Sequence, residues 1–175
     1  ADSPALPGLK PDYTIYDTAD QSALMKRTLA ALNLSTTNWP PRSVLGAISN
    51  AKNDLLDAEA FQSQAGDFYA KQLAKIYTSY SAAMRQAGAI DFDDLLLLTA
   101  KLLKKDQRAA AECRDRWRYL MIDEYQDTNR AQFEIANLLA QEPRIAPDAD
   151  SEQGKGTGRT APNICVVGDP DQAIY

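Results

Sequence analysis

Between residues 64 and 86 the apolar side chains recur every three or four positions, and this spacing constrains the fold more than any other feature of the sequence. The side chains that follow it are Leu73, Ile76, Tyr77, Tyr80 and Met84, and we assign Phe68, five positions before Leu73, to the same face. Positions three and four apart lie on one face of an α-helix. The segment therefore predicts a long amphipathic helix from about Gln64 to Gln86, stopped by Gly88.

Similar spacing elsewhere predicts at least four helices before Arg116. Thr18 can cap a first helix, with Gln21 reaching back to it. Proline suits the first turn of a helix, so Pro40-Pro41 predicts the next start, and its apolar side runs on to Leu55 and Leu56. Asp91 can cap a further helix, with Asp94 at the third position. Before these helices, residues 13–16 alternate in polarity and predict a short edge strand.

The pattern changes after Trp117. Residues 119–122 and 164–167 are short apolar runs that predict buried strands, and a helix is expected between them at about 130–140. Residues 142–162 are polar and rich in Pro and Gly, which predicts a long flexible loop. Two apolar strands separated by a helix indicate a parallel α/β core, yet two parallel strands leave faces to be covered. We expect a mainly α chain: a helical domain over 1–115, then an incomplete α/β piece over 116–175.

Composition excludes several classes of protein. The net charge of −5 argues against a surface that binds polyanions everywhere, although a local basic groove stays possible. The two cysteines, Cys113 and Cys165, lie far apart and the chain has no histidine, so a zinc site or a disulfide framework is not expected. The longest apolar run, Leu95 to Leu98, is far too short to span a membrane. The first residues do not resemble a signal peptide.

Two adjacent acids follow the first predicted strand. Asp123 and Glu124 come directly after Ile122. This is the Walker B arrangement of nucleotide hydrolases, in which an aspartate at a strand end holds Mg²⁺ and a glutamate acts on the attacking water. The alternative is an acidic turn that caps the next helix.

The second predicted strand is followed by the string GDPDQAIY, residues 168–175. Gln172 could hydrogen-bond a terminal phosphate, and Tyr175 could stack on an unpaired base. Taken alone, either could be an ordinary loop residue. The string GKGTG at 154–158 is not a phosphate-binding loop, because that motif needs GxxxxGK[ST] between a strand and a helix.

The strings DEYQDTN (123–129) and GDPDQAIY resemble motifs II and III of superfamily 1 DNA helicases of the UvrD/Rep/PcrA group. Ala173 replaces a serine that is usual in motif III. Upstream, ISNAKN (48–53) and IDFDDLL (90–96) resemble strings of the helical subdomain inserted into the first motor domain of these enzymes, and Tyr16-Asp17 with Asp20-Gln21 resembles its start. The resemblance covers almost the whole chain in the correct order.

The resemblance implies a role for each matched residue. Asp123 would hold Mg²⁺, and Glu124 would be the general base. Gln172 would sense the γ-phosphate of ATP, and Asp169 would support the motif III turn. Tyr175 would lie on the path of single-stranded DNA.

In the helical subdomain, Lys52 and Arg42 are candidates to contact the DNA backbone, and a solvated surface position is the alternative for each. The implied parent is a cytoplasmic, ATP- and Mg²⁺-dependent helicase that moves 3′ to 5′ on single-stranded DNA and unwinds duplex DNA in repair or replication. The 175 residues contain no Walker A string, so we expect this piece to be inactive alone. The other hypotheses are a non-catalytic helical module that binds DNA or protein, and a nuclease-linked helicase of the RecB/AddA type.

Overall fold

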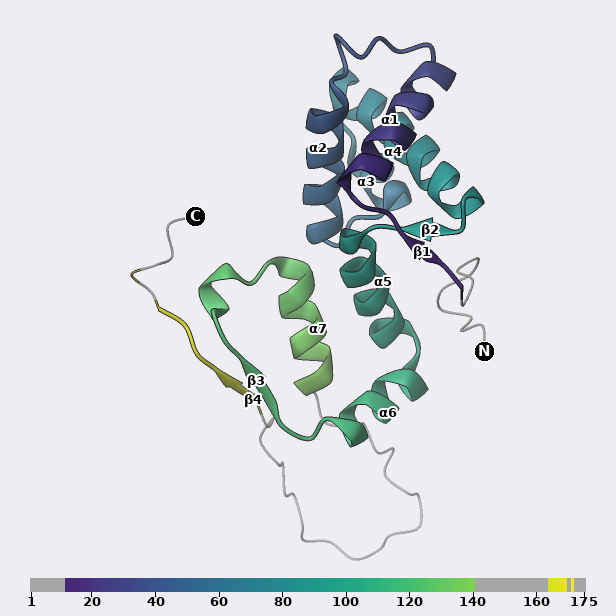
Figure 1. Cartoon of the computed structure of the whole chain (residues 1–175). Helices are drawn as coiled ribbons and strands as arrows, with labels where there is room; N and C mark the ends of the chain where they lie inside the picture. The colour runs from purple at the N-terminus through teal and green to yellow at the C-terminus, as the bar shows by residue number, and fades with distance from the viewer. Residues whose placement is uncertain (1–11, 141–163, 170, 172–175) are drawn as a thin grey trace, which may run out of the picture.

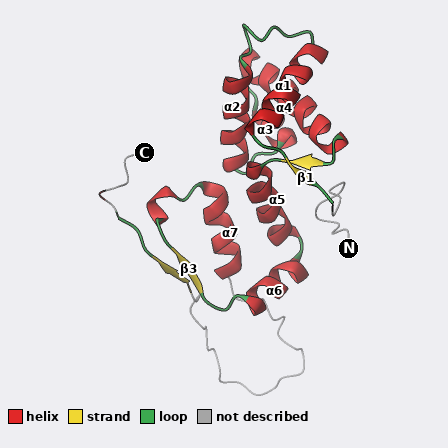
Figure 2. Cartoon of the chain, in the orientation of Figure 1, coloured by secondary structure: helices red, strands yellow, loops and turns green. Residues whose placement is uncertain are grey.

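The computed structural model describes residues 12–140, 164–169 and 171, and this part of the chain is mainly helical (Figures 1 and 2). The helices are α1 (Thr18–Ala31), α2 (Pro41–Asn53), α3 (Ala58–Gln64), α4 (Phe68–Gln86), α5 (Phe92–Lys105), α6 (Gln107–Arg116) and α7 (Arg130–Ala140). The strands are β1 (Thr14–Ile15), β2 (Ala89–Ile90), β3 (Leu120–Ile122) and β4 (Ile164–Val166). The predicted fold class, mainly α with a small strand–helix–strand unit, is confirmed. The predicted loop at 142–162 lies outside the described residues.

Two helix starts differ from the prediction because an aspartate takes the cap. Asp17, not Thr18, caps α1: its Oδ1 accepts hydrogen bonds from the backbone N–H groups of Ala19 and Asp20 at 2.8 and 2.9 Å. The long helix α4 begins at Phe68 rather than near Gln64, because Asp67 caps it with a 2.7 Å bond from the Ala70 N–H. Aspartate is a stronger N-cap than threonine, which accounts for the first difference.

Helix α2 begins as predicted, with Pro41 in its first turn, but it ends at Asn53. The expectation that it would continue through Leu55 is wrong. Leu55 has a φ of 63°, in the left-handed region, and this stops the helix. The predicted cap of α5 is confirmed, since Asp91 Oδ1 accepts from the Asp94 N–H at 2.8 Å.

Strands β1 and β2 join the beginning and the end of the first helical block. They are parallel, with Thr14 opposite Ala89 and Ile15 opposite Ile90. The turn before β2 uses Gly88 at a φ of 63°, a conformation that glycine adopts without strain. This pairing places the start of α1 beside the start of α5 (Figure 1).

The described residues form two hydrophobic clusters. The larger one lies among α1, α2, α4 and β2, and its most buried side chains include Met25, Leu29, Val44, Ile76, Tyr77 and Tyr80. The smaller one joins the end of α5 to α6 and α7 through Leu103, Ala110 and Leu138. Helix α5 also packs along α7 and against α2, so it connects the two clusters. The division into domains at residue 115 stays a prediction.

Two buried tyrosines of α4 differ in how their hydroxyl groups are satisfied. The Tyr77 hydroxyl donates to the Leu56 carbonyl at 3.1 Å. The Tyr80 hydroxyl is buried and has no hydrogen-bond partner among the described residues. Burial raises the pKa of both phenols far above the ordinary value, so both stay neutral.

This difference predicts that replacing tyrosine by phenylalanine changes the stability differently at the two positions. Tyr77→Phe should lower the free energy of unfolding by about 1 kcal/mol, because the Leu56 carbonyl loses its donor. Tyr80→Phe should be neutral or slightly stabilising, because it removes a polar group that pays a desolvation cost without a bond. Urea unfolding of the two variants checks this, and a loss at Tyr80→Phe equal to that at Tyr77→Phe would contradict it.

The second sheet consists of β3 and β4, which are parallel with Leu120 opposite Ile164 and Ile122 opposite Val166. Both predicted strands are thus observed, but the expectation that they are buried is wrong: Met121 is 76% exposed and Val166 is 49% exposed, because α7 is the only described helix packed near this two-stranded sheet. Helix α7 lies between this sheet and α5 (Figure 1). None of the helices in the described ranges has the length and hydrophobicity needed to cross a membrane.

Candidate functional site

The two candidate acids lie where β3 ends. Asp123 follows Ile122 directly and is exposed. Glu124 is also exposed, and its backbone has φ 52° and ψ 42°, in the left-handed region. A residue other than glycine adopts this conformation at an energetic cost and keeps it only when neighbouring structure holds it there. The strained residue here is the one predicted to act as general base.

The side chain of Gln126 connects this turn to the end of β4. Its Nε2 donates to Glu124 Oε2 at 2.5 Å, and its Oε1 accepts from the backbone N–H of Asp169 at 3.0 Å. One amide therefore joins the candidate base in motif II to the backbone of motif III. Sequence reasoning did not select Gln126, and its only signal was its place two residues after Glu124.

Backbone bonds and a glycine bring the two strand ends together. The Val167 N–H donates to the Ile122 carbonyl at 2.8 Å, and the Tyr125 N–H donates to the Val167 carbonyl at 3.0 Å. A Cβ atom on Gly168 would lie 2.8 Å from Gln126 Oε1, closer than real Cβ contacts. Glycine at position 168 therefore leaves room for the amide of Gln126.

The carboxylates fit the cation that the sequence predicts. Mg²⁺ prefers oxygen ligands and usually takes one or two protein carboxylates, with water and phosphate oxygens completing its shell. Asp123 offers an exposed carboxylate at a strand end, and Asp169 lies at the end of the paired strand. Within the described ranges, no three acidic, cysteine or histidine side chains gather into a cage for a metal. This donor set suits a cation that is held together with a bound phosphate.

The motif III residues are only partly described. Asp169 accepts a hydrogen bond from the Asp171 N–H at 2.9 Å, so it shapes the turn after β4. Gln172 and Tyr175 lie outside the described residues. Their contacts with phosphate and DNA stay predictions.

The expectation that Lys52 lies on a DNA-binding surface is wrong. Its side chain is 3% exposed, and its Nζ lies 2.7 Å from Asp91 Oδ2 and 2.8 Å from Asp94 Oδ1. Burial raises the pKa of Asp94, and the neighbouring Asp91 adds to the rise while Lys52 opposes it. Lys52 therefore neutralises the buried Asp91 and the partly buried Asp94 at the start of α5.

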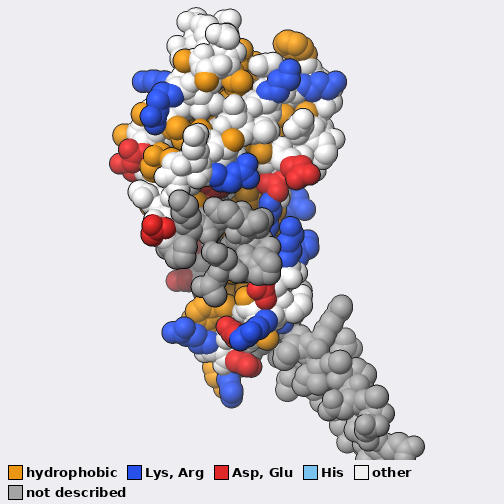
Figure 3. Space-filling model, turned by 90° about the vertical axis from the view of Figure 1, so that its right-hand side faces the viewer, with side chains coloured by type: hydrophobic (Ala, Val, Ile, Leu, Met, Phe, Trp, Pro, Cys, Tyr) orange, Lys and Arg blue, Asp and Glu red, His pale blue; other side chains and the backbone are white. Residues whose placement is uncertain are grey.

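The other DNA-contact candidate, Arg42, is exposed in the first turn of α2. The face drawn in Figure 3 carries lysine and arginine side chains in several groups, with acidic side chains among them. A continuous basic stripe is not visible on that face. A contact of Arg42 with DNA stays a prediction.

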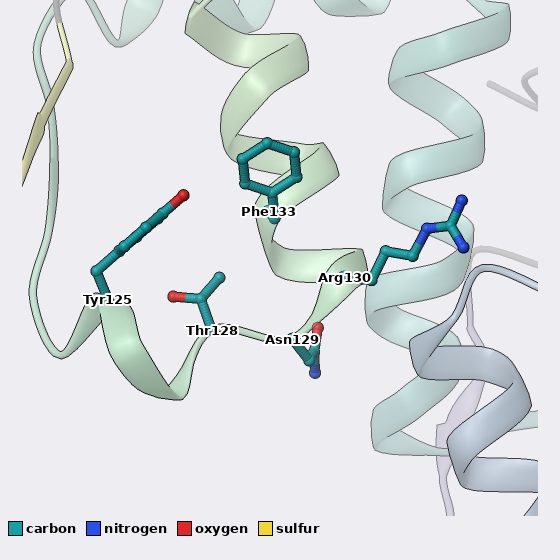
Figure 4. A pocket seen from close by; sticks show the side chains of 5 residues that line it. All are labelled: Tyr125, Thr128, Asn129, Arg130 and Phe133. Atoms are coloured by element: carbon teal, nitrogen blue, oxygen red, sulfur yellow. The ribbon is translucent and has the colours of Figure 1, made fainter. Parts of the chain in front are cut away.

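A pocket of about 330 Å³ lies beside the motif II turn. Its lining residues are Tyr125, Thr128, Asn129, Arg130 and Phe133. Tyr125 and Phe133 face this space from the turn and from α7, whereas Arg130 points away from both (Figure 4). The string DEYQDTN thus contributes to the pocket as well as to the acidic site.

The sequence of this chain matches known proteins over nearly its whole length. A profile of the "UvrD/REP helicase N-terminal domain" matches residues 2–175. An ATP-dependent DNA helicase PcrA from Leuconostoc citreum is 40% identical over 168 residues, 96% of this chain and 20% of the relative. The enzyme of the same name from Bacillus subtilis (strain 168) is 36% identical over 96% of this chain and 20% of its own length. The chain therefore spans about a fifth of these relatives. The match over nearly every residue shows that this chain belongs to the UvrD/REP helicase N-terminal domain family.

Proposed function

We propose that this chain is part of the first motor domain of an ATP-dependent helicase that moves 3′ to 5′ on single-stranded DNA and unwinds duplex DNA. The observation that carries the proposal is the joined pair of strand ends. Two exposed acids follow β3, and the hydrogen bonds of Gln126 connect one of them, Glu124, to the backbone of Asp169 after β4. Carboxyl ends of parallel strands are the usual place for nucleotide sites in α/β folds.

In this proposal Asp123 would hold Mg²⁺ together with the phosphates of ATP. A cation held there would supply the charge neutralisation that phosphoryl transfer needs. Glu124 would accept the proton of the attacking water, a role that suits an exposed carboxylate that forms no ion pair with a lysine or arginine of the described residues. Gln126 orients Glu124 by donating to its Oε2.

Motif III would couple the nucleotide to DNA. Gln172 and Tyr175 stand three residues apart after β4. If Gln172 contacts the γ-phosphate and Tyr175 stacks on a base, a movement at one ligand moves the other. The direct experiment measures ATP hydrolysis by the full-length protein with and without single-stranded DNA. An ATPase rate that DNA does not change would contradict the proposal.

The isolated 175-residue chain should show no ATP hydrolysis above background and only weak binding of Mg-ATP. Its sequence contains no GxxxxGK[ST] string to supply a lysine and a backbone cradle for the phosphates. Isothermal titration with Mg-ATP tests binding, with the full-length protein as the positive control. Micromolar affinity of the isolated chain would mean that a nucleotide site lies within these residues.

A further inference from the structure

Asn129, the last residue of DEYQDTN, uses both ends of its side-chain amide. Its Oδ1 accepts from the backbone N–H of Gln132 at 2.9 Å, and Gln132 Oε1 accepts from the Asn129 N–H at 3.0 Å. These reciprocal bonds cap the start of α7. Because a backbone N–H can only donate, the first bond establishes which end of the amide is oxygen. The nitrogen Nδ2 is left to donate to Asn53 Oδ1 in α2, at 2.8 Å.

Asn53 has two longer polar contacts on its own side. Its Nδ2 lies 3.4 Å from Asp93 Oδ1 and 3.4 Å from Ser49 Oγ. A carboxylate at neutral pH only accepts, so Asp93 directs the Asn53 amide nitrogen toward itself and the oxygen toward Asn129. The preceding residue, Lys52, is buried in its ion pairs with α5. The partner of Asn129 is therefore part of a well-packed region.

Only one tight turn separates Asn129 from Glu124. The Asp127 N–H donates to the Glu124 carbonyl at 2.9 Å, and the Thr128 N–H donates to the Tyr125 carbonyl at 3.1 Å, which closes the 3₁₀ turn η1 (Tyr125–Asp127). Such a turn has little freedom to absorb a shift at one end. Gln126 ties the turn to the end of β4, and Asn129 ties it to α2.

We propose that Asn129 is a positioning residue for Glu124. Its bond to Asn53 fixes the end of the motif II turn against α2, and together with Gln126 it holds Glu124 in its left-handed conformation. The position of α2 thereby sets the position of the candidate base. This inference rests on the proposed function, because it assigns a control to the same hydrolytic site.

The substitution Asn129→Asp separates this tie from the helix cap. Aspartate caps helices as well as asparagine, so α7 keeps its start. The new carboxylate, however, places an acceptor against Asn53 Oδ1. If the Asn53 amide rotated to donate to it, its carbonyl would face the carboxylate of Asp93. Asn53→Ala breaks the same tie from the other side and leaves the cap of α7 untouched.

The experiment measures DNA-stimulated ATP hydrolysis by the full-length protein. Both variants should lower kcat about tenfold, part of the roughly hundredfold that a 1 Å misplacement can cost, with the KM for ATP within about twofold of wild type. The double variant should be no slower than the slower single variant, because both break one bond. Asn137→Asp makes the same chemical change at an exposed position of α7 and should keep the wild-type rate.

Thermal unfolding of each variant separates positioning from stability. If kcat stays normal per folded molecule in Asn129→Asp and Asn53→Ala, the inference is wrong, whether or not the melting temperature falls. If neither variant folds, the bond is a folding contact and the inference is also wrong. Glu124→Gln is measured alongside: if it too hydrolyses ATP at the wild-type rate, the proposed function fails, whereas a loss there with normal Asn129 and Asn53 variants refutes only the positioning role.

Discussion

Replacing Glu124 by glutamine in the full-length protein should lower kcat for ATP by about a hundredfold or more, while ATP and DNA still bind. The amide has the shape of the carboxylate and can still contact water, but it cannot take a proton. Its oxygen can also keep the hydrogen bond that Gln126 Nε2 donates to Glu124. The loss should therefore appear in the chemical step alone.

The control for this experiment is Asp123→Ala, which should act differently. It removes the carboxylate that we assign to Mg²⁺, so it should raise the Mg²⁺ concentration needed for half-maximal activity. Steady-state kinetics at several Mg²⁺ concentrations, with nucleotide binding measured separately, distinguish the two roles. Equal ATPase rates for wild type and Glu124→Gln would remove Glu124 from the site.

Replacing Lys52 by methionine should destabilise this chain by about 3–5 kcal/mol, the range measured when one partner of a buried ion pair is removed. Methionine fills much of the volume of the lysine stem, but Asp91 and Asp94 would face each other without their cation. Their side chains are 4% and 17% exposed, so water cannot replace it fully. Urea unfolding of the chain measures the loss.

Two matched variants test the cause. Lys26→Met makes the same change at an exposed position of α1 and should shift stability by less than about 0.5 kcal/mol. Adding Asp91→Asn and Asp94→Asn to Lys52→Met should recover much of the stability, because asparagine also caps α5 and no charge stays buried.

The pH dependence of the Lys52→Met variant has a definite sign. Burial raises the pKa of Asp94 above its ordinary value of 3.8 even beside Lys52. A carboxyl whose pKa is raised by folding favours the folded state in its protonated form, so its ionisation destabilises the fold as pH rises. The deficit of Lys52→Met should therefore shrink as pH falls toward the folded-state pKa of Asp94. A deficit that does not change with pH would mean that lost packing, not charge, is the cause.

Local patterns in the sequence predicted the elements better than the contacts between them. The spacing of apolar residues in α4 and the cap of α5 depend on neighbours within a few positions, and both are found in the structure. The exception is Phe68, which was assigned to the apolar face but is 84% exposed at the start of α4. The boundary error at Asp17 arose because adjacent residues compete for the cap, and the error at Leu55 arose because a non-glycine residue adopts a left-handed conformation that the spacing does not predict. Each of these helix features is determined by residues within about one turn of one another.

The contacts that shape the candidate site join residues far apart in the chain. Lys52 and Asp91 are 39 positions apart, Gln126 and Asp169 are 43 apart, and Asn53 and Asn129 are 76 apart. No periodicity links such residues, so Lys52 was read as a surface cation and Gln126 and Asn129 were not selected. Asp123 and Glu124 were selected because their place at a strand end is itself a local pattern.

The left-handed backbone of Glu124 sets two selection pressures against each other at one position. Glycine adopts this conformation freely and asparagine does so more readily than glutamate, so a library screened for folding yield alone would enrich both at position 124. A screen for turnover would retain the carboxylate and its strain. Substitutions at position 124 that raise thermal stability should therefore lower activity, as is common when a reactive group is held in an unfavourable conformation.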